Sequence, residues 1–154
     1  MDHVAIMERT GVVLEKVLAG EKTIETRWTK TNKTPYEKIR PGDVIYFRNT
    51  MKPITAKATV QKTLFFSPLN QTIIQGILKK YGKAACMSME QDYESIKETN
   101  YCTLIFLEGV ESTTPFHVDK TGFGSGAAWM TLPDITAIKK AEHIPRHYAL
   151  KRTA

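Results

Sequence analysis

The sequence predicts a mixed α/β protein of the α+β class, in which a small closed or partly open β-barrel is flanked by helices. Three observations predict this class. The length of 154 residues is typical of one domain, so we treat residues 1–154 as a single domain. A composition of 42% hydrophobic and 25% charged residues is that of a globular protein. Strand-like segments outnumber helical ones and do not alternate with them regularly, as they would in a doubly wound sheet.

The N-terminal segment is expected to hold two strands separated by a helix. Val4–Met7 is a short apolar run typical of a buried strand. Thr10 is placed to cap a helix whose apolar residues follow the helical period, and Gly20 is placed to end it. Thr23–Trp28 is rich in β-forming residues and is predicted to be the second strand.

The next segment connects this strand to two more. Residues 29–40 are mostly polar and are expected to form an exposed loop. Pro41-Gly42-Asp43 predicts a tight turn, because Pro presets its own φ and Gly tolerates positive φ. Val44–Phe47 then predicts a central strand. Apolar residues partly alternate along Ile54–Phe66, which predicts a long, half-buried strand.

Two helices are expected in the middle of the chain. Ser67 followed by Pro68 is typical of a helix start, and Gly82 is placed to end this helix. Ser88 with Gln91 resembles a capping box, which predicts a second, shorter helix directly behind it.

The last part of the chain is expected to add three strands. Tyr101–Leu107 has the strongest strand character in the sequence. Pro115–Val118 and Ala128–Leu132 are predicted to be short strands separated by the loop Lys120–Gly126. No element is assigned from Ile135 onward.

Charge is distributed unevenly along the chain, whose net charge is +6. Residues 22–48 and 139–152 are rich in Lys and Arg, whereas residues 90–111 are rich in Asp and Glu. This distribution favours one face that meets a polyanion. The alternative is a solvent-exposed surface on which the charged side chains are unevenly distributed but bind no ligand.

Several classes of protein are not expected. No apolar run approaches the roughly 20 residues of a membrane span, and the N-terminus lacks the layout of a signal peptide, so a cytoplasmic protein without a membrane partner is expected. Cys86 and Cys102 suggest buried free thiols rather than a disulfide framework. His143 and His147 have a four-residue spacing, but Pro145 argues against a helix there. Neither a metal nor another cofactor is therefore expected.

The most informative segment is residues 20–27, which bring Lys22, Glu25 and Arg27 together at a helix–strand junction. In an extended strand successive side chains alternate, so Thr23, Glu25 and Arg27 share one face. Ile24, Thr26 and Trp28 share the other. A carboxylate and a guanidinium on one face are costly to bury apart, and they tend to pair or to serve a ligand. An ion pair on a solvated strand is the alternative.

The pattern Gly20-x-Lys22-x-x-Glu25-x-Arg27, followed by Pro41-Gly42-Asp43 and a strand, resembles the ASCH family. The resemblance covers roughly residues 3–111, and residues 112–154 are expected to be a family-specific extension of the same domain. It implies a PUA-like β-barrel with a cleft for RNA or modified bases, in which Lys22, Glu25 and Arg27 form the polar floor.

One branch of the family consists of amidohydrolases that remove the acetyl group from N4-acetylcytidine. Their catalytic set is the motif Lys, a Thr three residues after it, and a distant Glu. Lys22 matches the first member, but Glu25 occupies the Thr position, where Thr23 or Thr26 would have to substitute. Glu90 and Glu94 are candidates for the distant Glu. Other family members are described as ribonucleases.

Binding of RNA or a modified nucleoside is the favoured function, with single-stranded DNA as a further possible ligand. Lys22 and Arg27 would hold phosphate while Glu25 accepts a hydrogen bond from an exocyclic amine. The alternative is an enzyme. In it Lys22 acts as a nucleophile or a base, Glu25 transfers a proton, and Arg27 stabilises the anion that develops. A protein-interaction module without nucleic acid is the third class. The candidate binding residues are Lys22, Glu25, Arg27, Lys30, Arg48, Ser125 and Trp129.

Aromatic residues and a glycine-rich loop are the remaining candidates. Trp28 and Tyr93 are expected to be core residues, as is one of Tyr46 and Phe47. The loop Lys120–Gly126 resembles an anion-binding nest, with an ordinary hairpin loop as the alternative. If the barrel brings this loop over the motif cleft, Ser125 and Trp129 complete the pocket.

Overall fold

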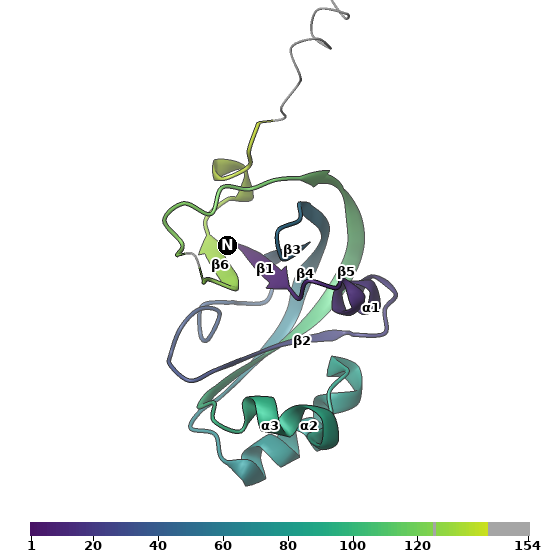
Figure 1. Cartoon of the computed structure of the whole chain (residues 1–154), viewed down its shortest axis with the longest axis vertical. Helices are drawn as coiled ribbons and strands as arrows, with labels where there is room; N and C mark the ends of the chain where they lie inside the picture. The colour runs from purple at the N-terminus through teal and green to yellow at the C-terminus, as the bar shows by residue number, and fades with distance from the viewer. Residues whose placement is uncertain (125, 142–154) are drawn as a thin grey trace, which may run out of the picture.

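The computed structural model describes residues 1–124 and 126–141, in which six strands form one curled sheet with helices packed on it (Figure 1). The strands are β1 (Asp2–Met7), β2 (Ile24–Thr29), β3 (Val44–Asn49), β4 (Ile54–Phe66), β5 (Tyr101–Phe116) and β6 (Trp129–Leu132). The helices are α1 (Val12–Leu18), α2 (Gln71–Ala85) and α3 (Met89–Ile96), and a 3₁₀ turn follows at Ile135–Ala137.

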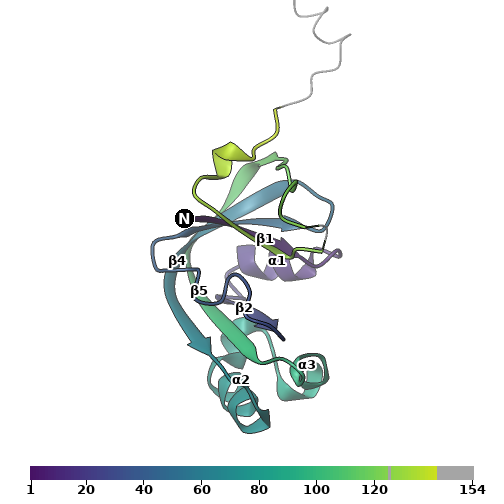
Figure 2. The ribbon, with the colours of Figure 1, turned by 90° about the vertical axis from the view of Figure 1, so that its left-hand side faces the viewer.

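The sheet has the strand order β2-β5-β4-β3-β1-β6, so β2 and β6 are its two edge strands. β1 and β3 run parallel, and all other neighbouring strands are antiparallel. The long strands β4 and β5 extend along most of the molecule, and their pairing is interrupted by register shifts (Figure 2). Such bulges increase twist and bend the strands, which curls the sheet into a half-barrel.

The inside of the half-barrel holds the largest apolar core. Ala5, Phe47 and Ile105 project from three different strands into this core, and Leu14 and Val17 of α1 cover it. The same interior receives Trp129 from β6. The side chains that α1 buries are three residues apart, as expected for a helix packed on one face.

The helices α2 and α3 pack on the outer face at one end of the sheet (Figure 1). Ile24 of β2 contacts the same cluster as Ile77 of α2, and Trp28 lies between this cluster and Ile96 of α3. A smaller core lies on the outer face of β1 and β3, where Met130, Leu132 and Ile135 cover Val4.

The predicted helix ends differ from the observed ones. Gly11, not Thr10, is the N-cap of α1, and the first-turn amide of Val13 donates instead to the Glu8 carboxylate at 3.2 Å. Asn70, not Ser67, caps α2, and its side chain accepts the Ile73 amide at 2.9 Å.

The end of α2 was also predicted one turn too early. Gly82 is a buried residue inside the helix, and Cys86 ends it in the left-handed region at φ 56°. A Cβ on Gly82 would lie 2.6 Å from the Met87 carbonyl oxygen, so this glycine permits a close approach of backbone. The prediction for α3 is confirmed, since the Ser88 hydroxyl accepts the Gln91 amide at 3.1 Å.

Two further predictions need correction. Residues 29–40 do not form a fully exposed loop, because Tyr36 and Ile39 are buried at 8% and 1% exposure. Tyr36 packs edge-on against Phe65 and Tyr101, which anchors the loop to the sheet. Tyr101–Phe116 is one continuous strand rather than two, because β4 pairs with both of its halves.

None of the described helices has the length and hydropathy needed to cross a bilayer.

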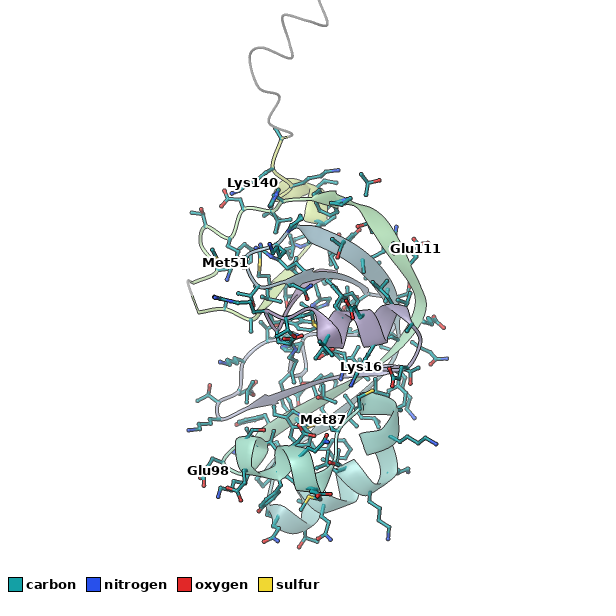
Figure 3. The ribbon with its side chains drawn as sticks, turned by 45° about the vertical axis from the view of Figure 1, so that its right-hand side comes forward. Lys16, Met51, Met87, Glu98, Glu111 and Lys140 are labelled. Atoms are coloured by element: carbon teal, nitrogen blue, oxygen red, sulfur yellow. The ribbon has the colours of Figure 1, made fainter. Side chains whose placement is uncertain are left out.

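The acidic side chains of residues 90–111 do not gather at one place on the molecule. Figure 3 shows Glu98 at the helical end of the molecule and Glu111 on β5 in the other half, where its carboxylate lies 3.3 Å from the Lys57 amine.

Candidate functional site

The motif strand β2 presents its side chains as the alternation predicted. Glu25 and Arg27 project into the half-barrel, opposite Ile105 and Thr103 of β5 in the ladder. Ile24 and Trp28 project from the other face into the core beneath α2. The guanidinium and the carboxylate therefore lie in the interior of the sheet rather than on a solvated face.

Arg27 joins the two edges of the curled sheet. Its Nη1 donates to the Ala128 carbonyl oxygen at 3.2 Å, and its Nη2 donates to the Ile6 carbonyl oxygen at 3.4 Å. The guanidinium carbon lies 5.0 Å from the centroid of the Trp129 ring, which is a cation–π distance. Because β2 and β6 are edge strands, this side chain spans the gap where the barrel is not closed by backbone hydrogen bonds.

Glu25 supplies the countercharge inside the sheet. Its Oε1 lies 3.6 Å from Arg27 Nε, and the two side chains are 6% and 17% exposed. Burial lowers the pKa of the Arg27 guanidinium, and the charge of Glu25 opposes this. Within the described part of the chain, Glu25 Oε2 and Arg27 Nε have no hydrogen-bond partner, so the pair retains donor and acceptor capacity.

A pocket of about 390 Å³ opens at the gap between β2 and β6. Its volume lies within the range of small-ligand sites. The walls come from three segments: the end of β2, the loop behind it, and the glycine-rich loop that leads into β6. They comprise Arg27, Trp28, Thr29, Lys33, Thr34, Pro35, Phe123, Gly126, Ala127, Ala128 and Trp129. The described part of the glycine-rich loop thus lies beside the end of the motif strand at this pocket.

Side-chain contacts hold the pocket walls in place. The Thr34 and Thr131 hydroxyls are hydrogen-bonded to each other across the gap. Lys120 Nζ donates to the Ala127 carbonyl oxygen at 3.0 Å, which folds the glycine-rich loop back on itself. Gly122 and Gly124 both have φ near +90°, a conformation that favours glycine.

Behind the pocket, Trp129 is fixed by a buried histidine. Trp129 Nε1 donates to His3 Nδ1 at 3.0 Å, and His3 Nε2 lies 2.8 Å from Asp43 Oδ2. Since an indole N–H can only donate, His3 Nδ1 carries a lone pair and Nε2 carries the proton given to Asp43. Burial lowers the pKa of His3, and the neighbouring Asp43 opposes this. The Pro41-Gly42-Asp43 turn therefore supports the site indirectly, through Asp43.

The predicted site residues are only partly brought together. Arg27 and Trp129 contact each other in the pocket, and Glu25 lies beside Arg27. Lys22 is 6% exposed, does not line the pocket, and donates from Nζ to the Ala85 carbonyl oxygen at 2.7 Å. It thereby binds the last residue of α2.

The other candidates lie elsewhere. Lys30 is exposed on the loop after β2, and the Arg48 side chain on β3 does not line the pocket. Glu90 and Glu94 are exposed on α3, and Glu94 pairs with Lys97. The Thr26 hydroxyl lies on the outer face of β2, 3.2 Å from the Met87 sulfur.

Some of the residues named in the predictions pack in the core, and others lie outside the residues that the structure describes. Phe47 is fully buried, Tyr46 packs in the smaller outer core, and Tyr93 packs against the α3 cluster, as expected. Ser125, like His143 and His147, lies outside the described residues. Of residues 1–124 and 126–141, no three His, Cys, Asp or Glu side chains are close enough to hold a metal ion.

Several residues of the pocket and its support were not predicted, among them Phe123, Lys33 and His3. Phe123 lies between two glycines of the predicted loop; it lines the pocket and also packs against the smaller outer core. No sequence pattern distinguishes Lys33 from the rest of its polar segment, and its position at the pocket wall follows from the fold of the loop. The role of His3 has no signature in the sequence, because its partners Asp43 and Trp129 are distant along the chain.

Comparison with solved structures shows the fold. The structure of ASCH from Zymomonas mobilis has a TM-score of 0.63 and 14% identity, covering 90% of this chain and 96% of that chain. Two mutant proteins of ZmASCH give TM-scores of 0.63 and 0.65, with 14% and 17% identity, and cover 90% and 88% of this chain and 99% and 91% of theirs. No family model and no curated protein sequence matches. The chain therefore has an ASCH-like fold of the PUA-like kind.

Proposed function

We propose that this protein binds RNA or a modified nucleoside in the pocket between β2 and β6. The observation that carries the proposal is the Arg27 guanidinium, which lies on the Trp129 indole at the wall of a pocket of about 390 Å³. A guanidinium plane held against an aromatic ring offers a flat, cationic surface on which a base can stack. Phe123 and Trp28 supply further aromatic surface in the same pocket.

Charge supports the same ligand class. Lys33 is an exposed amine at the pocket wall, and Lys30 is exposed three residues earlier on the same loop. An exposed amine beside a stacking surface is suited to a phosphate, whose contact contributes affinity that falls with salt. Glu25 does not line the pocket, and it supports the site by holding the Arg27 guanidinium through its countercharge.

The hydrolase alternative is not favoured by any contact in the described structure. An attacking or activating Lys22 would need a free amine, but its Nζ is bound to Ala85 at the end of α2. Glu25 occupies the position where the amidohydrolase branch has Thr. We therefore keep hydrolysis of N4-acetylcytidine as an outcome of the test.

The test is a titration of a short single-stranded RNA at several salt concentrations. We expect Lys33→Gln to weaken binding and to reduce the slope of log K against log salt by about 0.7, the value of one single-strand phosphate contact. Phe123→Ala is expected to weaken binding by about 1–3 kcal/mol without changing the slope. Lys79→Gln, on the exposed side of α2, is the matched control and should change neither quantity.

The same samples are assayed for turnover of N4-acetylcytidine, with single-stranded DNA and the free nucleoside as competing ligands. An RNA affinity that is the same in Lys33→Gln, in Phe123→Ala and in the unmodified protein would contradict the proposed pocket. Turnover that Lys22→Met abolishes would make the protein an enzyme instead.

A further inference from the structure

The pocket has a titratable group directly behind its wall. His3 is completely buried, and its ring lies 5.7 Å from the Trp129 ring, centroid to centroid. Trp129 in turn contacts Arg27 at the pocket wall. One histidine thus supports the stack on which the proposed ligand would lie.

His3 Nδ1 has two neighbours of different chemistry. Trp129 Nε1 lies at 3.0 Å and can only donate, whereas the Thr131 hydroxyl lies at 3.2 Å and can donate or accept. In the neutral ring the Nδ1 lone pair accepts the indole N–H. A protonated Nδ1 would face that N–H as a second donor, and only Thr131 could accept from it.

We propose that protonation of His3 switches the wall of the β2–β6 pocket. The neutral ring holds the Trp129 indole beneath Arg27, and the protonated ring exchanges this bond for one to Thr131 and releases the indole. The proton enters at Nδ1 from solvent, and Nε2–H remains bonded to Asp43. The consequence for ligand affinity rests on the proposed function, whereas the movement of the indole does not.

The charged groups around His3 influence the pH at which the switch operates. Asp43, before β3, favours the protonated ring, and Asp2 on β1 does so at longer range. The Met1 amino group, 3.2 Å from Asp43 Oδ1, opposes it. From β6 only the uncharged Trp129 and Thr131 contact the ring, and Arg27 lies beyond the indole. Since burial lowers the pKa of His3 below 6.5, the ring is neutral at pH 7 and the switch operates at a pH below 6.5.

The first readout is the ¹⁹F NMR spectrum of protein labelled with 5-fluorotryptophan, with the two resonances assigned by Trp28→Phe. Between about pH 7.5 and the acid limit at which the protein unfolds, we expect the Trp129 resonance to move along one titration curve with its midpoint below 6.5. The Trp28 resonance serves as an internal reference, since the Trp28 N–H is bonded to Thr26. His3→Asn, which keeps an acceptor near Nδ1 but cannot titrate, should give a flat curve.

Two variants complete the series. His117→Asn makes the same change at an exposed histidine and should leave the Trp129 curve as in the unmodified protein. Thr131→Val removes the alternative acceptor and should move the midpoint to lower pH. If His3→Asn does not fold, an unshifted midpoint in Thr131→Val overturns the proposal.

The second readout is the affinity for a short RNA without terminal phosphates, whose own charge does not titrate in this range. Acidification should weaken binding by at least about fivefold in the unmodified protein and in His117→Asn, and by less than about twofold in His3→Asn. A Trp129 resonance that does not titrate, or that titrates equally in His3→Asn, overturns the switch. If no RNA binds at any pH, the proposed function fails, and the resonance alone decides the switch.

Discussion

Arg27 combines three roles that a single side chain rarely holds. It neutralises Glu25 inside the sheet, donates to the Ile6 and Ala128 carbonyl oxygens, and lies on the Trp129 indole. A planar guanidinium can do this because its donors point in several fixed directions while its faces stay free for stacking. A lysine in the same place would offer a point charge without a face.

The first prediction concerns this pair. Arg27→Met should lower the free energy of unfolding by about 3–5 kcal/mol, because it leaves the buried Glu25 carboxylate without its countercharge. Adding Glu25→Gln to Arg27→Met should recover at least about 1 kcal/mol, since the remaining group is then neutral. Urea unfolding of the two variants measures both values. A double variant that is no more stable than Arg27→Met would show that the two charges are not coupled.

At the scale of elements, α2 is fixed by contacts at its C-terminal end. The helix continues through Gly82, and this residue has to be a glycine because the Met87 carbonyl oxygen lies 2.6 Å from where a Cβ would be. It ends at Ala85, whose carbonyl oxygen accepts from Lys22, and Cys86 adopts the left-handed conformation after it. An ammonium group at this end is favourable because helix C-termini carry partial negative charge. The motif lysine thus connects the start of β2 to the helix that covers it.

Two glycines of α2 make a matched pair for the second prediction. Gly82→Ala should destabilise the protein by about 1–3 kcal/mol, because the clash outweighs the gain in helix propensity. Gly76→Ala, where nothing lies within 4 Å of the new Cβ, should stabilise it by about 0.5–1 kcal/mol. Thermal and urea unfolding compare the two. Stabilisation by both substitutions would refute the close approach at Gly82.

The third prediction separates a structural from a ligand role of Lys22. Lys22→Met should lower stability by about 1–2 kcal/mol and speed hydrogen exchange in the last turn of α2, because a buried bond to Ala85 is lost. Lys83→Met, an exposed change in the same turn, is the control and should be near neutral. A folded Lys22→Met protein with intact exchange protection but without RNA binding would place Lys22 in the ligand site instead.

Strands and helices were predictable where the local pattern determined them. The bounds of β4 were predicted because Ile54, Ala56, Ala58 and Val60 alternate, and they are buried as expected. The middle of β5 was missed because residues 108–114 carry no such alternation, and this segment is a strand through its pairing with β4. The α2 start was missed because Ser67-Pro68 and Asn70 both resemble helix starts, and only the bond to Ile73 distinguishes them.

At the scale of the whole molecule, the pocket exists because the sheet curls without closing. β2 and β6 lie at opposite ends of the strand order but approach each other in space, and side chains rather than a backbone ladder bridge them (Figure 1). The motif predicted that Glu25 and Arg27 would share a face, since alternation is local. The meeting of Arg27 with Trp129, and of His3 with Asp43, depends on the path of the entire chain.

The last prediction is the pH dependence of global stability, which His3 and Asp43 determine in two windows. Burial lowers the pKa of His3 below 6.5, so the unfolded chain binds more protons than the folded one just below that pH. The contribution of His3 to stability is therefore fully present above about pH 6.5 and is lost as the pH falls through the pKa of His3 in the folded protein.

Asp43 determines the lower window. Burial alone would raise the pKa of Asp43, but hydrogen bonds from His3, the Arg40 amide and the Met1 amino group lower it below 3.8. Its contribution is present above 3.8 and is lost at lower pH. Urea unfolding across this range should show both losses. His3→Asn should remove the upper loss and reduce the lower one, because it also removes a hydrogen bond that lowers the pKa of Asp43. His117→Asn should change neither. A single loss confined to the lower window would mean that His3 does not discriminate between folded and unfolded chain, and that β1 is not held to β3 and β6 through its neutral ring.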